Sequence, residues 1–312
     1  MTQTSVSTRA WAEMGVLALI WGASFLSIKL GLEEIPFLTL VAHRVIWACV
    51  ILWIYVLIRR LPVPGDLRIW GAFVVMGMLN NVIPFALMAW GQQFIETGLT
   101  SIFNAGTAIF GVLVAALCFA DERLTLRKSI GVAVAFAGVA VAIGLDSLRQ
   151  FDIRSLAQLA VIGGTFSYAL ASAWARKRLM GLTPAVAAAG MLTGASLILL
   201  PAALVMDGAP TWPALPQTYL AVGYFAVFGT AFAYLLYYRV LAMVGTGNAM
   251  LVTLLIPPVA IILGAVVLEE RLAPEAFLGF ALLAVGLLIL DGRILRVLKR
   301  GSKHLTGGHG LP

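Results

Sequence analysis

The sequence has 312 residues and a formal net charge of +7, and 61% of its residues are hydrophobic while only 11% are charged. Soluble domains carry about 25% charged residues, so this composition excludes a soluble fold and indicates an integral membrane protein. A membrane helix needs about 20 apolar residues, so the chain has room for about ten spans with short connections and for no separate soluble domain.

Apolar runs bounded by charge, proline or glycine predict ten transmembrane helices. The runs are continuously apolar rather than alternating, which favours an all-α polytopic membrane protein over a barrel. The predicted spans are 11–32, 36–58, 68–91, 97–119, 126–145, 155–175, 183–206, 217–240, 246–268 and 273–291. The glycine-rich tail, 301–312, is predicted to be disordered.

The positive charge lies in the predicted loops, which argues against a nucleic-acid partner. With the N-terminus inside, sixteen Lys and Arg residues fall on the cytoplasmic side and four on the outer side, while Arg44 lies within a span. Cytoplasmic loops are enriched in Lys and Arg. We therefore expect the N- and C-termini to be cytoplasmic.

Two segments 148 residues apart indicate an internal duplication. Leu99–Leu124 ends in Asp-Glu-Arg-Leu and Gly247–Leu272 ends in Glu-Glu-Arg-Leu, and the same offset relates Gly131 to Gly279 and Gly138 to Gly286. Five spans per half is an odd number, so the halves must enter the membrane from opposite faces. This predicts one membrane domain, 1–312, built as a 5+5 inverted-topology repeat of 1–148 and 149–300, an architecture of transporters whose substrate site lies near the midplane.

The first and ninth spans carry recognisable residues. The first reads Ile20-Trp21-Gly22-Ala23-Ser24-Phe25 and is followed by Lys29, Pro36 and Arg44. The ninth and the segment after it carry Asn248, Pro257-Pro258, Glu270-Arg271-Leu272, Gly279 and Gly286. With these residues the chain resembles the ten-helix EamA-type branch of the drug/metabolite transporter superfamily. The resemblance implies a single-domain exporter of small metabolites that works by alternating access without ATP, and it is nearest to the subgroup that exports amino acids, aromatic ones in particular.

Polar residues inside a membrane are costly and mark candidate sites. Those at a common depth near the midplane, together with the deepest tyrosine of the eighth span, form our predicted substrate site. It comprises Trp21, Ser24, Asn80, Asn81, Thr107, Thr165, Tyr168, Tyr234 and Thr253. Helix packing is the alternative role for the hydroxyl and aromatic members, and contact between helices is the alternative for the two amides.

Glycines and prolines within the spans are candidate hinges. Gly22, Gly163 and Gly164 permit either close packing or bending. Pro84, like the pair Pro257-Pro258, removes a backbone donor, so the pair predicts a kink or hinge in the ninth span. The first half carries Ile109-Phe110 where the second has these prolines, so a hinge of this kind is expected in one half only.

Arg44 lies about two turns below the outer end of the second span. We expect it to form a structural ion pair with Glu33 or Glu34 across the short outer turn. On this interpretation no lysine or arginine is available in the substrate cavity.

Absent motifs narrow the function. The sequence has no phosphate-binding loop for ATP, no carboxylate at mid-membrane depth and no set of residues with metal-ligand spacing. We therefore expect no cofactor, no metal and no obligate organic-cation substrate.

The favoured function is a secondary transporter that exports neutral or zwitterionic metabolites, amino acids first, across a bacterial inner membrane. Its partners are then a small-molecule substrate and the lipid bilayer. A broad drug or nucleotide-sugar carrier is the first alternative. An intramembrane enzyme, which needs a nucleophile and a base at depth, is the second. The exact substrate, proton coupling, oligomeric state and resting conformation stay open.

Overall fold

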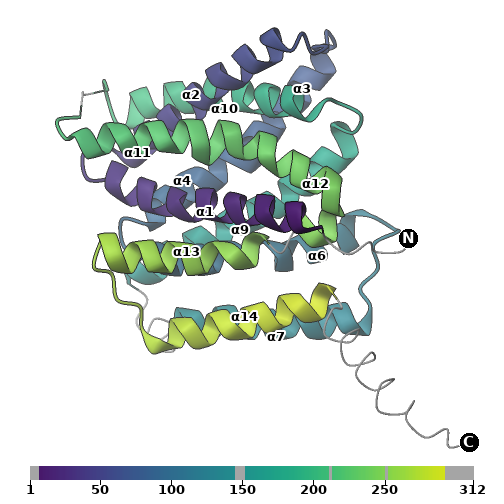
Figure 1. Ribbon diagram of the computed structural model, residues 1–312, viewed down its shortest axis with the longest axis vertical. Helices are drawn as coiled ribbons and strands as arrows, with labels where there is room; N and C mark the ends of the chain where they lie inside the picture. The colour runs from purple at the N-terminus through teal and green to yellow at the C-terminus, as the bar shows by residue number, and fades with distance from the viewer. Residues whose placement is uncertain (1–6, 145–151, 211–212, 250–251, 292–312) are drawn as a thin grey trace, which may run out of the picture.

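The computed structural model describes residues 7–144, 152–210, 213–249 and 252–291, and the elements of these segments are helices (Figure 1). In chain order they are α1 (Thr8–Gly31), α2 (Phe37–Ile58), α3 (Leu67–Gly77), η1 (Met78–Val82), α4 (Ile83–Gly91), α5 (Thr97–Ala105), α6 (Thr107–Cys118), α7 (Leu126–Ile143), α9 (Ile153–Arg178), α10 (Pro184–Met206), α11 (Pro216–Ala226), η2 (Val227–Phe232), α12 (Ala233–Ala249), α13 (Val252–Val267) and α14 (Pro274–Asp291). The tail 301–312 lies outside the described residues.

These elements make ten helical segments, because α3-η1-α4, α5-α6 and α11-η2-α12 each form one span. Eight are long and apolar enough to cross a membrane, and the two shorter ones are 252–267 and 274–290. The predicted all-helical membrane fold is confirmed. The predicted end of the eighth span at residue 240 is wrong, because α12 continues through a glycine-containing stretch to Ala249.

Prolines and side-chain caps set where several helices begin. Pro184 and Pro216 occupy the first helical positions of α10 and α11, where a missing N–H costs nothing. The side chains of Asp66, Thr125 and Asp152 accept hydrogen bonds from the first turns of α3, α7 and α9. The short connections between spans therefore carry the signals that end one helix and start the next.

The two halves interlock across the whole molecule. The first span of each half packs on the third and fourth spans of the other, so α1 contacts α11, α12 and α13 while α9 contacts α4, α5 and α6. The second spans, α2 and α10, pack together, and so do the fifth spans, α7 and α14, which lie side by side in Figure 1. This exchange of partners is what an approximate two-fold relation between duplicated halves requires.

The duplicated glycines lie in the contact between α7 and α14. A Cβ atom on Gly138 would lie 2.4 Å from the Leu283 nitrogen, and one on Gly286 would lie 2.4 Å from the Ala135 nitrogen. A Cβ atom on Gly131 would lie 2.8 Å from the Leu290 nitrogen, and one on Gly279 would lie 2.6 Å from the Ala142 nitrogen. Glycine at these positions therefore allows the two backbones to touch.

The third span of each half contains a π-helical turn. These turns are η1 and η2, and Asn81 and Thr230 are each the fourth residue of their turn. Both side chains are buried, with 0% and 1% of their surface exposed. Since π-turns occur frequently at functional sites, their presence at matching places in both halves marks the region where the halves meet.

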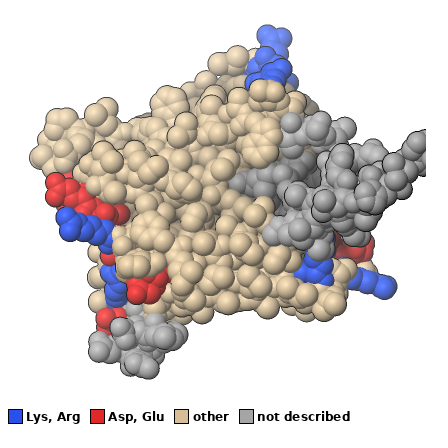
Figure 2. Space-filling model, turned by 60° about the horizontal axis from the view of Figure 1, so that its bottom comes forward, with Lys and Arg blue, Asp and Glu red and all other residues tan. Residues whose placement is uncertain are grey.

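Charged side chains gather at the margins of the face seen in Figure 2, and a broad area of other residues lies between them. This distribution suits a protein whose middle faces lipid and whose ends face water.

Candidate substrate site

The two amides predicted to line the site meet one tyrosine. The Nδ2 groups of Asn80 and Asn81, on η1, donate to the Tyr234 hydroxyl on α12 at 3.2 Å and 3.0 Å. Asn80 also lies 3.4 Å from the Met191 sulfur. The π-turn makes this convergence possible, because it changes the angle between successive side chains. Three predicted site residues are therefore joined, and the contact links the two halves.

Arg44 lies beside these residues, with 8% of its surface exposed. Its guanidinium carbon is 3.5 Å from the ring centre of Phe85, on α4, and 3.9 Å from that of Phe225, on α11. Its Nε donates to the Thr230 hydroxyl at 2.8 Å. Within the described part of the chain, no carboxylate forms a salt bridge with Arg44. Aromatic faces thus partly compensate a buried cation that lacks a counterion.

The predicted ion pair between Arg44 and Glu33 or Glu34 is wrong. Glu34 instead accepts hydrogen bonds from the backbone at the start of α11 and from the Thr218 hydroxyl, and Glu33 accepts one from Gln217. Except for the buried Thr218, these partners are exposed, whereas Arg44 is buried within the bundle. The Thr218 hydroxyl, aided by two backbone N–H groups, holds the pKa of Glu34 below its ordinary value of 4.5. Arg44 is therefore not used in an ion pair at the outer turn, and contact of Arg44 with the substrate stays a proposal.

Tyr168 closes the group from α9. Its ring meets that of Phe85 edge to face, with centres 6.4 Å apart. The neighbouring Ser167 donates to the Leu79 carbonyl of η1 at 2.7 Å, so α9 supports the π-turn directly. We call the following six residues the central polar cluster: Arg44, Asn80, Asn81, Tyr168, Thr230 and Tyr234. They come from four spans and from both halves.

Other predicted site residues are not part of this cluster. The hydroxyls of Ser24, Thr107 and Thr165 donate to carbonyls of their own helical turns, at 2.9, 2.7 and 2.7 Å. Such local bonds fit a packing role. Trp21 packs on Tyr237 with ring centres 5.5 Å apart, and Thr253 lies half-buried on α13.

The three candidate hinge glycines differ in how closely other helices pack against them. A Cβ atom on Gly22 would lie 2.6 Å from Val259 on α13, and one on Gly164 would lie 3.3 Å from the Pro84 Cα. Gly163 has only one atom near it, at 3.7 Å. Close packing therefore explains Gly22, and a bending role for any of the three stays a prediction.

The prolines of the ninth span lie inside one continuous helix, α13, with Pro257 buried and Pro258 exposed. A hinge there stays a prediction. The fourth span of the first half has a break that the sequence analysis did not predict, at Gly106 between α5 and α6. The π-turns are further departures from regular helix, and they occur in both halves.

The sequence analysis missed four features of the site: Thr230, Phe85, Phe225 and the position of Arg44. Thr230 holds the same place in its π-turn as Asn81 does in the other. The 148-residue offset of the repeat pairs Asn81 with Gly229 instead, so the repeat alone did not identify Thr230. The aromatic pair carried no signal, because phenylalanine is ordinary in an apolar helix.

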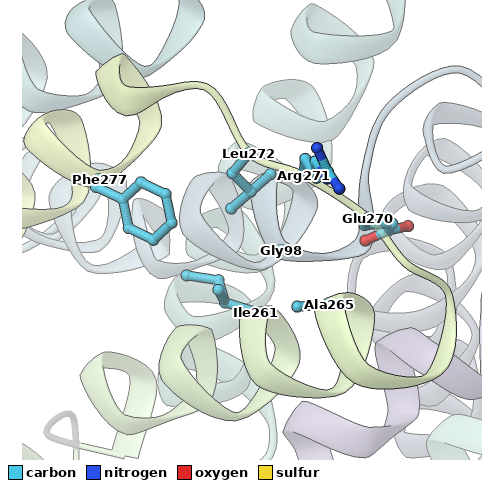
Figure 3. A pocket seen from close by; sticks show the side chains of 7 residues that line it. All are labelled: Gly98, Ile261, Ala265, Glu270, Arg271, Leu272 and Phe277. Carbon is cyan, nitrogen blue, oxygen red and sulfur yellow. The ribbon is translucent and has the colours of Figure 1, made fainter.

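Two cavities lie near the start of α5, and no member of the central polar cluster lines either. One, of about 350 Å³, is shown in Figure 3 and is bordered by Gly98, Ile261, Ala265, Glu270, Arg271, Leu272 and Phe277. Its neighbour, of about 320 Å³, shares Glu270. The Glu270 carboxylate accepts hydrogen bonds from the Thr97 nitrogen and hydroxyl, so it caps α5. This acidic residue of the duplicated motif therefore has a structural role.

Glu270 belongs to a set of three carboxylates that each cap a helix of the opposite half. Asp207 accepts from the Thr39 nitrogen and hydroxyl at 2.7 and 2.8 Å, in the first turn of α2. Glu34 does the same for α11. An anion at a helix N-terminus satisfies free N–H groups and the helix dipole. These three helix starts lie at one end of the bundle, so the halves are bound together there.

Residues 13–144 match the EamA-like transporter family, and residues 155–290 match it a second time. The chain belongs to the EamA-like transporter family. An EamA-family protein is a transporter rather than an enzyme, and the double match agrees with the duplicated fold.

Proteins similar to this chain include transporters whose names give a substrate class. The "Probable amino-acid metabolite efflux pump" of Escherichia coli (strain K12) is 28% identical over 88% of this chain and 93% of its own length. The "Probable terminal-alkyne amino-acid exporter" of Streptantibioticus cattleyicolor is 28% identical over 93% and 95%. A solved crystal structure superposes with a TM-score of 0.65 at 17% identity, covering 92% of this chain and 98% of the other, which supports the fold alone.

Proposed function

We propose that this EamA-family protein is a secondary transporter that exports small neutral or zwitterionic metabolites, amino acids first, by alternating access. One observation carries the proposal. The central polar cluster joins side chains of both halves in the middle of the bundle, where a change in the relation of the halves would expose it to one side or the other. Two of the similar proteins described above are named for amino-acid efflux or export.

The proposal includes an orientation and a location. The charge count puts both termini in the cytoplasm, and the "Uncharacterized inner membrane transporter YedA" of Escherichia coli is 23% identical over 88% of each chain. We therefore propose export across a bacterial inner membrane. Reporter fusions at Arg60 and Arg178 should give cytoplasmic signals, and a fusion at Gly208 the opposite. Reversed signals would contradict this orientation.

A nucleotide-sugar carrier is the second candidate, and Arg44 is the observation that favours it. Phosphorylated substrates need a cation at the site, and Arg44 supplies one. However, the central polar cluster offers a single charge, whereas a sugar diphosphate carries two or more. This comparison favours a substrate with one carboxylate.

The test is transport by purified protein in liposomes, with a panel of neutral amino acids, nucleotide sugars and organic cations. We expect exchange of at least one neutral amino acid well above that of empty liposomes. The control is a variant that replaces an exposed arginine outside the cluster, Arg68→Gln, which should transport at the wild-type rate. Transport restricted to nucleotide sugars or cations would contradict the proposal.

A further inference from the structure

We propose that Arg44 binds the carboxylate of the transported substrate and that the Asn81 amide oxygen accepts a hydrogen bond from its ammonium group. This inference rests on the proposed function and narrows it. It identifies free α-amino acids as the substrate class. Amino-acid amides, amino-acid esters and amines that lack a carboxylate are then not substrates.

The contacts of Arg44 leave one way for an anion to reach it. The rings of Phe85 and Phe225 both lie within 4 Å of the same guanidinium carbon, and we infer that one ring covers each face of the group. Its Nε is bonded to Thr230, and its terminal nitrogens have no hydrogen-bond partner among the described residues. An acceptor must therefore approach in the guanidinium plane, at the terminal nitrogens. A planar carboxylate fits that edge with parallel hydrogen bonds.

Tyr234 adds a second donor. Its hydroxyl oxygen accepts hydrogen bonds from both Asn80 and Asn81, so its own hydrogen remains to be donated. Phenol and guanidinium donors in one cluster both favour a negatively charged ligand group. Tyr234 lies one helical turn after Thr230, which accepts a hydrogen bond from Arg44, so we infer that the phenol is a second donor for the same carboxylate.

Asn81 supplies a hydrogen-bond acceptor beside these donors. Its side chain is fully buried, and its amide oxygen has no hydrogen-bond partner in the described parts of the chain. A buried acceptor left unpaired is unusual and needs an explanation. A substrate ammonium group would satisfy it. The cluster thus offers donors for an anion and an acceptor for a cation, as the two charged groups of an α-amino acid require.

Charge balance supports the same substrate. Among the described residues Arg44 has no carboxylate counterion, so a bound carboxylate would pair with a buried charge that the protein leaves unpaired. An amine without a carboxylate would instead bring a second positive charge beside Arg44. Its binding is therefore opposed by both repulsion and the missing hydrogen bonds.

The test measures counterflow of radiolabelled L-phenylalanine, L-leucine and L-threonine into liposomes that hold wild-type protein. Unlabelled L-phenylalanine, L-phenylalaninamide and phenethylamine then compete with the label. We expect the amide and the amine to compete at least about tenfold more weakly than the free amino acid, since each loses the charge-assisted hydrogen bonds to Arg44. This comparison uses wild-type protein and does not depend on whether a variant folds.

Two variants connect the discrimination to Arg44. Arg44→Lys keeps the charge and should retain the preference for the free amino acid with weaker apparent affinity. Arg44→Gln should lose transport or lose the preference, and Arg68→Gln should match the wild type. Gel filtration in detergent shows whether each variant is folded.

The outcomes separate the inference from the proposed function. Absence of counterflow with all three amino acids would overturn the carboxylate assignment, and transport restricted to nucleotide sugars or organic cations would overturn the proposed function as well. Counterflow that the amide inhibits as well as the free amino acid, or a folded Arg44→Gln variant with wild-type discrimination, would overturn the assignment alone.

Discussion

At the scale of single residues, the site depends on which polar atoms are paired. The Tyr234 hydroxyl accepts hydrogen bonds from two amides. Within the described part of the chain, Arg44 makes one hydrogen bond and packs against two phenylalanine rings. The amides and the tyrosine therefore form a fixed frame. Arg44 keeps donors available within that frame, which is the arrangement expected of a site that must bind and then release its ligand.

Replacing Tyr234 by Phe should damage this frame. The change leaves the Nδ2 group of the fully buried Asn81 without its acceptor, while the half-buried Asn80 keeps the Met191 sulfur. A buried unpaired polar group costs about 1–3 kcal/mol. We expect a lower melting temperature in detergent and a marked loss of transport in liposomes. Tyr55→Phe, at an exposed position on α2, is the matched control and should change neither. A Tyr234→Phe variant with wild-type stability and transport would contradict this account of the cluster.

Glu34 gives a prediction about pH. Hydrogen bonds from Thr218 and from the α11 backbone lower its pKa from 4.5. Its contribution to stability is therefore complete above that ordinary value and is lost as the pH falls towards the lowered one. Between about pH 6 and about pH 4, the melting temperature should fall more for the wild type than for Glu34→Gln. Glu33→Gln, whose carboxylate meets only Gln217, should behave like the wild type. Equal slopes in all three would show that Glu34 does not act in this way.

At the scale of the elements, the sequence predicted what depends on composition and missed what depends on register. Long apolar runs located the spans closely. Backbone N–H and C=O groups in lipid must be hydrogen-bonded within the protein, and a helix satisfies them within one segment. The apolar runs did not predict the π-turns η1 and η2, because one extra residue per helical turn does not change the hydrophobicity of the segment. The prediction for Arg44 was wrong for a related reason. Which side of α2 faces the partner half depends on tertiary packing, which the sequence pattern does not show.

The close contact of α7 and α14 tests the meaning of the duplicated glycines. In Gly138→Ala the new methyl group would lie 2.4 Å from the Leu283 nitrogen and 2.7 Å from the Gly279 oxygen. Overpacking against backbone costs about 1–3 kcal/mol, so we expect a lower melting temperature. Gly111→Ala, which meets nothing within 4 Å on α6, should be neutral or stabilising because alanine favours helix. A stabilised Gly138→Ala variant would show that the two helices can separate at no cost.

At the scale of the whole molecule, the two ends are built differently. The end that carries the starts of α2, α5 and α11 is held by carboxylates that cap helices of the opposite half, in addition to a salt bridge between Arg154 and Glu96. The other end carries salt bridges between partly exposed side chains, such as Arg176 with Asp121 and Arg239 with Glu13. Exposed ion pairs contribute little, so opening at that end is the less costly movement.

The same view of the molecule predicts how transport is driven. Proton-coupled carriers use a titratable group at depth, so that protonation biases the same two states as the substrate. Every Asp and Glu lies at or beyond the end of a predicted span. His43, the only histidine within a predicted span, is not a member of the central polar cluster. A zwitterion carries no net charge across the membrane field. We therefore expect net transport down the substrate's own gradient, without obligatory proton exchange.

The measurement uses liposomes with equal L-phenylalanine, L-leucine or L-threonine on both sides and an imposed pH gradient. We expect no accumulation, because neither the central polar cluster nor the substrate changes charge with the gradient. Accumulation that a protonophore abolishes would contradict the prediction. If His43→Ala also abolished it while equilibrium exchange persisted, the proton would be assigned to His43. In that case the outer part of α2 would supply the coupling group beside the residue that holds the substrate.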